Sequence, residues 1–169
     1  MRRLLDGLYD LAAGLAALCM VGLLLMVLLS IVSRQLHFYV PGTDAYAGYL
    51  MAASGFLALA HTLKRGEHIR VTLLLSALRG SARRAMEIWA LCAASALALL
   101  GAYYSARLVW QSHTFHDIST SNDATPLWMP QIGMAVGSII LAIALIDELV
   151  LALCGQRHSP TPAEAAHNE

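Results

Sequence analysis

Long apolar runs alternate with short polar stretches and divide the chain into four segments. The runs cover about residues 11–33, 46–63, 86–108 and 129–153, and the first contains no charged residue. The hydrocarbon core of a bilayer is about 30 Å thick and takes roughly 20 helical residues to cross. The pattern therefore predicts an all-α membrane protein. Residues 1–154 are expected to form one domain of four transmembrane helices, and residues 155–169 a mobile tail.

Composition strengthens this interpretation. Of the 169 residues, 58% are hydrophobic and 13% charged, and the mean hydropathy is +0.61. Soluble domains are nearer about half apolar and about a quarter charged, so this chain has too little charge to solvate a globule of its size. Its 11 basic and 11 acidic residues leave a formal net charge of zero. A nucleic-acid-binding protein is therefore not expected.

Orientation follows from the distribution of Lys and Arg over the loops, because cytoplasmic loops carry an excess of both. The predicted helices place two basic residues, Arg34 and Arg107, on one side of the membrane. The opposite side carries the other nine, namely Arg2, Arg3, Lys64, Arg65, Arg70, Arg79, Arg83, Arg84 and Arg157. Both termini and the middle loop are thus predicted to be cytoplasmic.

The middle loop has a pattern of its own. Between Ile69 and Leu78, apolar residues recur at 69, 73, 74, 77 and 78, which is close to helical spacing. Basic residues follow at 79, 83 and 84. One interpretation is a short amphipathic helix that lies in the inner interface between the second and third spans. The other is an extension of one of these two spans.

Side chains able to do chemistry are few and scattered. Cys19, Cys92 and Cys154 form no CxxC pair, which a membrane disulfide oxidoreductase would need. Haem held by two histidines needs ligands from two helices at similar depth. Of the seven histidines, only His61 falls inside a span. The sequence therefore predicts no catalytic residue, no metal site and no cofactor on this chain.

A proton-driven exporter would need a carboxylate buried in the membrane. The first three predicted spans have no such residue in their interiors, and the candidates are Asp147 and Glu148, which lie about two turns from the end of the fourth span. At that depth we expect them to pair with a basic group and to anchor the helix. Within this chain the available partners are Arg2, Arg3 and Arg157.

The spans do offer rows of small residues, which let helix backbones approach closely in membranes. Span four contains a GxxxG at Gly133 and Gly137, and span two contains Gly48, Ala52 and Gly55. Span three has alanine at every fourth position: Ala90, Ala94, Ala98, Ala102 and Ala106. These rows predict a protein built to pack against other helices.

Residues 41–71 carry the most specific pattern. Asp44 opens the second span, a helix of small residues follows, and the turn after it reads Lys64-Arg65-Gly66-Glu67-His68-Ile69-Arg70-Val71. Thr125-Pro-Leu-Trp-Met-Pro-Gln131 precedes the fourth span. In these features residues 11–153 resemble the small membrane subunit of tripartite ATP-independent periplasmic (TRAP) transporters. The chain departs from the family pattern at Ala45 and Thr72, where an acidic residue is common.

The resemblance implies a function. The chain would be a non-enzymatic scaffold in the bacterial inner membrane, bracing a large transmembrane TRAP subunit that carries the sodium and substrate sites. A periplasmic substrate-binding protein would deliver an organic acid. Residues expected to face a partner or phospholipid are Asp44, Lys64, Arg65, Gly66, Glu67, His68, Arg70, Asp147 and Glu148. The alternative is a stand-alone four-helix membrane protein, either a small exporter or a redox subunit.

Overall fold

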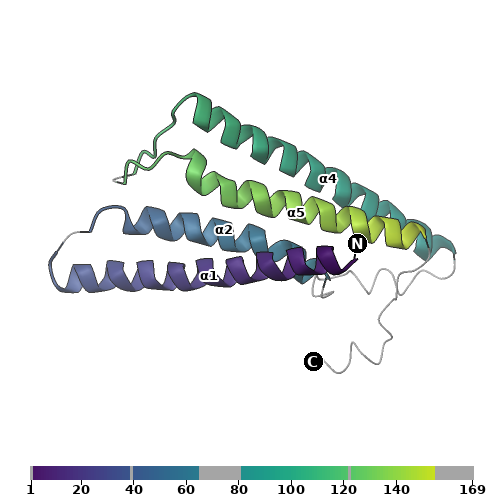
Figure 1. The fold of residues 1–169 in the computed structure, drawn as a ribbon, viewed down its shortest axis with the longest axis horizontal. Coiled ribbons are helices and arrows are strands. Elements are labelled where there is room, and N and C mark those ends of the chain that lie inside the picture. The colour runs from purple at the N-terminus through teal and green to yellow at the C-terminus, as the bar shows by residue number, and fades with distance from the viewer. Residues whose placement is uncertain (1, 39, 65–80, 122, 155–169) are drawn as a thin grey trace, which may run out of the picture.

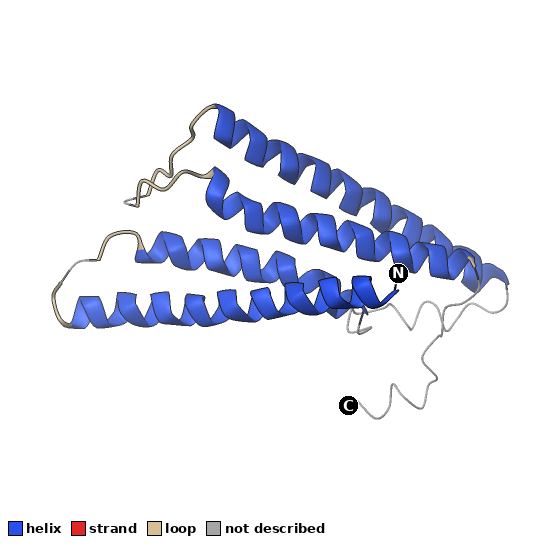
Figure 2. Cartoon of the chain, viewed as in Figure 1, coloured by secondary structure: helices blue, strands red, loops and turns tan. Residues whose placement is uncertain are grey.

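The computed structural model describes residues 2–38, 40–64, 81–121 and 123–154. Within these ranges it contains four helices and no named strand, which confirms the all-α prediction (Figure 2). They are α1 (Arg2–Gln35), α2 (Thr43–Lys64), α4 (Ser81–Thr114) and α5 (Trp128–Leu153). The suggested amphipathic helix at 69–78, the turn residues Arg65 to Arg70 and the tail lie outside the described residues.

The helices form two antiparallel hairpins that pack side by side (Figure 1). Across the molecule the order is α1, α2, α5, α4, because α1 packs on α2, α2 on α5 and α5 on α4. We call the end where α1 begins and α5 finishes the terminal end. The opposite end carries residues 36–38, 40–42, 115–121 and 123–127 and is called the loop end.

Three of the four described helices are long and apolar enough to cross a membrane, over Leu5–Gln35, Arg84–Thr114 and Trp128–Leu153. They correspond to the first, third and fourth predicted spans. Helix α2 is not among them, because Gly, Ser, Thr, Tyr and His residues dilute its apolar content. The second span therefore remains a prediction.

Two of these helices extend well beyond the apolar runs from which they were predicted. Helix α1 begins at Arg2 rather than near residue 11, and α4 covers 81–114 rather than 86–108. Helical hydrogen bonding continues through charged residues such as Asp6 and Arg84. Hydropathy locates the part of a helix that can sit in lipid, but not where the helix itself ends.

Both long helices end in the same way at the loop end. His37 and His116 adopt the left-handed conformation, with φ of 56° and 54°. The next N–H then bonds back to a carbonyl five residues earlier, Phe38 to Ser33 at 3.1 Å and Asp117 to Ser112 at 3.0 Å. This is the Schellman arrangement, which satisfies carbonyls left over at a helix end. It turns each hairpin toward its second helix.

Candidate functional site

The most intimate contact in the described structure joins the two hairpins at the middle of α2 and α5. A Cβ built on Gly137 would lie 2.5 Å from the carbonyl carbon of Phe56 and 2.8 Å from the backbone nitrogen of Leu57. A Cβ on Gly133 would lie 2.7 Å from the Cβ of Ala53. Only glycine leaves room for backbones this close. The GxxxG of the fourth span thus lies directly against α2.

The small residues predicted on α2 lie elsewhere. Gly48, Ala52 and Gly55 are all exposed, and a Cβ on either glycine would meet nothing within 4 Å. At its contact with Gly133 and Gly137, α2 therefore meets α5 through Ala53, Phe56 and Leu57, not through this row. The sequence shows the row but not the side of the helix on which a partner lies.

The alanine row of α4 is in contact with α5 only in its middle. Ala94 and Ala98 pack against the cluster that contains Leu91 and Leu145, and Ala102 is half-buried, whereas Ala90 and Ala106 are exposed. Each step of four residues turns about 40° past a full helical turn, so the row drifts by about 160° from end to end. The face that packs on α5 includes Leu91, Ser95, Ala98, Ala102 and Ser112, at a period nearer seven residues.

A polar network fastens the hairpins at the loop end. Tyr49 donates a hydrogen bond to Ser119 at 2.8 Å and to Asp123 at 3.3 Å, and Tyr46 bonds to Thr125 at 3.0 Å. Hydrogen bonding from Thr125, and then from Ser119 and Tyr49, lowers the pKa of the Asp123 carboxyl. Asp123 is therefore ionised at neutral pH and accepts a hydrogen bond from Tyr49 of α2.

Gly42 is needed beside this network. Its φ of +81° favours glycine, and a Cβ there would lie 2.7 Å from the Cβ of Asp123. The α1–α2 loop and the α4–α5 loop are therefore in direct contact, although Gly42 and Asp123 are far apart in the sequence.

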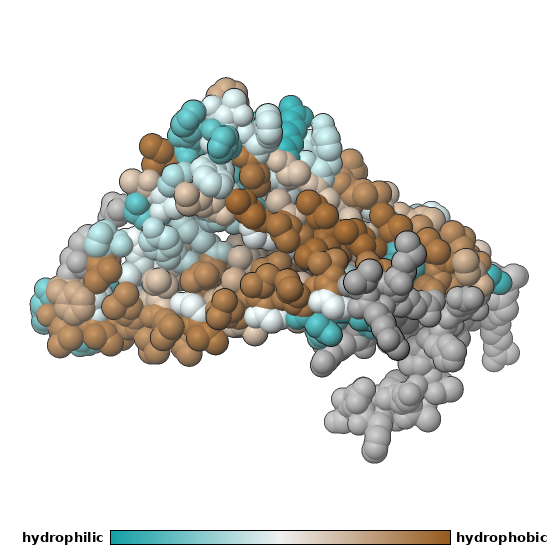
Figure 3. All heavy atoms as spheres, viewed as in Figure 1, coloured by the Kyte–Doolittle hydropathy of each residue, from teal (hydrophilic) through white to brown (hydrophobic). Residues whose placement is uncertain are grey.

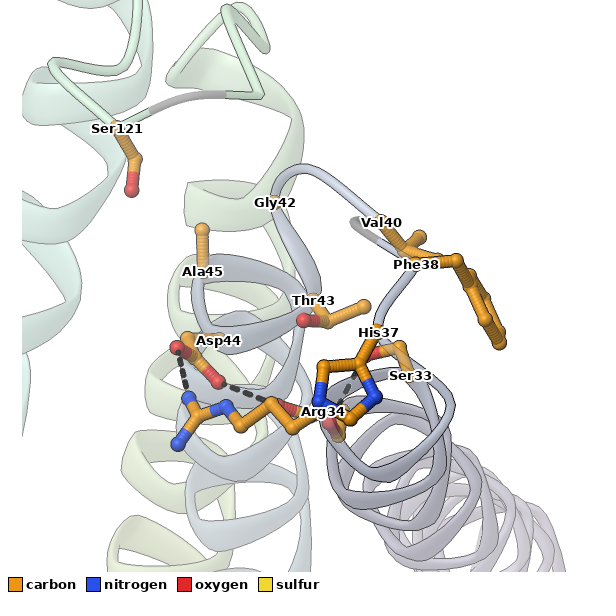
Figure 4. Close-up of a pocket in the computed structure, with 11 residues that line it drawn as sticks. Ser33, Arg34, His37, Phe38, Val40, Gly42, Thr43, Asp44, Ala45 and Ser121 are labelled. Carbon is orange, nitrogen blue, oxygen red and sulfur yellow. Dashed lines mark hydrogen bonds and ion pairs between the residues drawn. The ribbon is translucent and has the colours of Figure 1, made fainter.

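Asp44 lies at the loop end and joins α1 to the start of α2 (Figure 4). It pairs with Arg34 at 3.2 Å and accepts a hydrogen bond from Ser30 at 3.1 Å. The side chains of Arg34 and Asp44 are 73% and 77% exposed, and such surface pairs stabilise proteins by only about 0–1 kcal/mol. A recess of about 310 Å³ opens around the pair, lined also by His37 and Thr43. Because Arg34 and Asp44 neutralise each other, the recess presents no unpaired charge from this pair to a ligand.

A second polar cluster joins α1, α2 and α5 at the terminal end. Asp6 forms an ion pair with Lys64, and Asp10 lies 3.7 Å from His61. The Lys64 ammonium also lies 4.6 Å from the centre of the Tyr9 ring, within reach of a cation–π interaction. These contacts were not predicted, although the sequence contains a signal for them. Asp6 and Asp10 are one helical turn apart, as are His61 and Lys64, so an antiparallel hairpin brings the two pairs together.

Asp147 and Glu148 reach the same cluster from α5. Both are half-buried and, together with Tyr9 and Lys64, surround a gap too narrow to hold a water molecule. Tyr9 is 2% exposed, and its hydroxyl has no hydrogen-bond partner among the described residues. Lys64 is thus a described cation that lines the same gap as these two carboxylates. The partners expected from the sequence were Arg2, Arg3 and Arg157, whose side chains lie outside the described part of the structure.

No group of three or more His, Cys, Asp or Glu side chains that could hold a metal ion occurs among the described residues. The three cysteines are free, and Cys92 and Cys154 are exposed. What the described structure offers is helix contact, fastened by polar side chains at both ends.

Sequence comparison identifies the kind of protein to which this architecture belongs. The family model for tripartite ATP-independent periplasmic transporters, DctQ component, matches residues 23–155. The chain belongs to this family. A search of curated proteins found no match. The match covers well over half of the chain and includes Asp44, the turn after Lys64 and the GxxxG of α5.

Family membership confirms the resemblance seen in the sequence and makes the chain a small subunit of a TRAP transporter. Because the family is a transporter component, the family match favours this interpretation over a stand-alone exporter or a redox subunit. The three apolar helices also place it among membrane proteins.

Proposed function

We propose that this DctQ-type chain braces the large transmembrane subunit of a sodium-driven TRAP importer of an organic acid in the bacterial inner membrane. The observation that carries the proposal is the family match, and the open row of helices supports it. In their most apolar stretches, only 11% of α1 residues and 17% of α4 residues are buried within the chain, compared with 39% in α5. Most of the outer helix surfaces thus remain available to lipid and to a partner.

The division of labour in this proposal is simple. The large subunit holds the sodium ions and the substrate, a periplasmic binding protein delivers the organic acid, and this chain holds no cofactor. Its contribution is packing: a rigid pair of hairpins, locked by Gly133 and Gly137 and by the polar networks at both ends.

The test is sodium-driven uptake in vesicles that contain both membrane subunits, with the binding protein present. We expect the two subunits to co-purify and uptake to require both. His113→Gln, His116→Gln and Cys19→Ser should leave uptake close to that of wild type, because a scaffold needs no reactive side chain. Loss of uptake in one of these variants, with the subunit complex intact, would show that this chain supplies chemistry and would overturn the proposal.

The proposal also includes sidedness, with both termini in the cytoplasm. An even number of crossings agrees with the structure, where α1 begins and α5 finishes at the same end (Figure 1). The nine-to-two imbalance of Lys and Arg selects the cytoplasmic side for that end. A reporter active only in the periplasm should be inactive when fused after Glu169 and active when inserted near Ser119. The reverse result would contradict the orientation and leave the bracing role untouched.

A further inference from the structure

A groove of about 430 Å³ lies between α4 and α5 toward the loop end. It is lined by Tyr104, Ser105, Arg107, Leu108, Gln111 and Met134. Tyr104 is 59% exposed, and Arg107 and Gln111 are exposed as well, so the groove opens outward from the helix pair. Large apolar areas cover the helices on the face shown in Figure 3. A groove among helices with such surfaces would be exposed to lipid.

The depth of Arg107 in the bilayer follows from the length of its helix. The apolar segment Arg84–Thr114 has 31 residues, which at about 1.5 Å per residue makes about 46 Å. The hydrocarbon core takes about 30 Å of this, which leaves about 8 Å at each end if the helix is centred. Arg107 lies seven residues, or about 10 Å, before Thr114. Its guanidinium is therefore at the boundary between acyl chains and head groups.

Arg107 has no acidic partner in the described part of the structure. Among the described residues it forms no ion pair, whereas Arg34, the other basic residue on the loop side, is paired with Asp44. An arginine at the edge of the hydrocarbon region extends toward phosphates, and leaving it without a partner is costly. Trp110 is 75% exposed one turn further out, an aromatic position typical of the membrane interface.

The residues that line the groove also favour a lipid with an anionic head group over a zwitterionic one. None of the six residues is a carboxylate, so no negative charge in the lining would pair with the ammonium group of a zwitterionic lipid. Arginine instead matches a phosphate through paired N–H donors. Gln111 and Ser105 add uncharged hydrogen-bonding groups next to it.

An apolar track leads away from the groove along α4. Leu97, Gly101, Tyr104 and Leu108 recur at steps of four and three residues and so share one helix face. Leu97 is 70% exposed, Leu108 is 41% exposed, and a Cβ built on Gly101 would meet nothing within 4 Å. This face can receive an acyl chain whose head group lies at Arg107.

We propose that the groove between α4 and α5 binds one anionic phospholipid, with the phosphate on Arg107 and an acyl chain along Leu97 and Leu108. The proposal concerns this chain alone and does not depend on its role in transport.

The test measures the affinity of the purified full-length chain for phosphatidylglycerol and for phosphatidylcholine, by native mass spectrometry of lipid titrations in detergent. Wild type should bind one phosphatidylglycerol more tightly than phosphatidylcholine. Arg107→Gln should weaken that binding about tenfold or more, because a charge-assisted hydrogen bond to phosphate is lost. Arg107→Lys, which keeps the charge, should retain part of the affinity.

Arg34→Gln is the matched control, since it removes an equal charge from the same side of the protein but one already paired with Asp44. It should leave phosphatidylglycerol binding unchanged. Equal losses in the Arg34 and Arg107 variants, or no loss in Arg107→Gln, would overturn the proposal. Displacement of the lipid by inorganic phosphate would overturn it too, by showing a simple anion site. Separation of Arg107→Gln from the large subunit, with lipid binding intact, would assign Arg107 to a protein carboxylate instead.

Discussion

Replacing Gly137 by alanine should destabilise the folded chain by about 1–3 kcal/mol, the usual cost of forcing atoms into a packed interior. The added methyl group would lie 2.5 Å from the carbonyl carbon of Phe56 and 2.6 Å from its oxygen. Both atoms belong to the backbone of α2, so no side chain can rotate out of the way. The helices must move apart, and this contact holds the two hairpins together at mid-depth. Thermal unfolding of the purified protein in detergent would measure the loss.

Gly55→Ala is the matched control for this experiment. It makes the same chemical change in the middle of a neighbouring helix, but its methyl group would meet nothing within 4 Å. Alanine is a better helix former than glycine by up to about 1 kcal/mol, so this variant should be as stable as wild type or more so. Equal destabilisation by the two substitutions would mean that glycine itself, rather than the α2–α5 contact, determines the effect.

These two glycines show how much of the packing the sequence could reveal. Both belong to rows of small residues, and both rows predict close helix contact. The structure places Gly137 against a backbone and leaves Gly55 exposed. A small residue permits close approach but does not determine which neighbour approaches. That choice depends on how the hairpins dock, and docking is fixed partly at the loop end by Tyr49, Asp123 and Gly42.

Helix number and class, by contrast, followed from short-range information. Long apolar runs were enough to predict α1, α4 and α5, because a run of about 20 apolar residues fits the thickness of the bilayer whatever its neighbours are. The terminal-end cluster was not predicted as a cluster. Pairing of Asp147 and Glu148 with a cation stays a prediction, and the contribution of Tyr9, Asp6 and His61 depends on three helices meeting at one place. Long-range contacts of this kind are not visible in local patterns.

Ala98→Leu should also destabilise the chain by about 1–3 kcal/mol, through overpacking of the contact between α4 and α5. Ala98 is half-buried and packs against the cluster formed by Leu91, Leu145 and Ala152. Leucine adds bulk at this point, and among the described helices α5 is the one with which α4 makes its extensive contact. Thermal unfolding should show the loss. Transport assays should then show lower uptake in proportion to the smaller amount of assembled complex.

Ala90→Leu is the control that separates overpacking against α5 from any general effect of replacing an alanine of α4 by leucine. Ala90 belongs to the same row of alanines, but eight residues at about 100° each place it about 80° around the helix from Ala98. It is exposed in the structure, so a leucine there can extend away from α5 at little cost. If Ala90→Leu proved as damaging as Ala98→Leu in the isolated chain, the row would act as one continuous contact surface. If it left the isolated chain stable but prevented assembly with the large subunit, the terminal half of the row would face the partner. Because the row of alanines turns around α4, its middle would then pack against α5 and its terminal half against the large subunit.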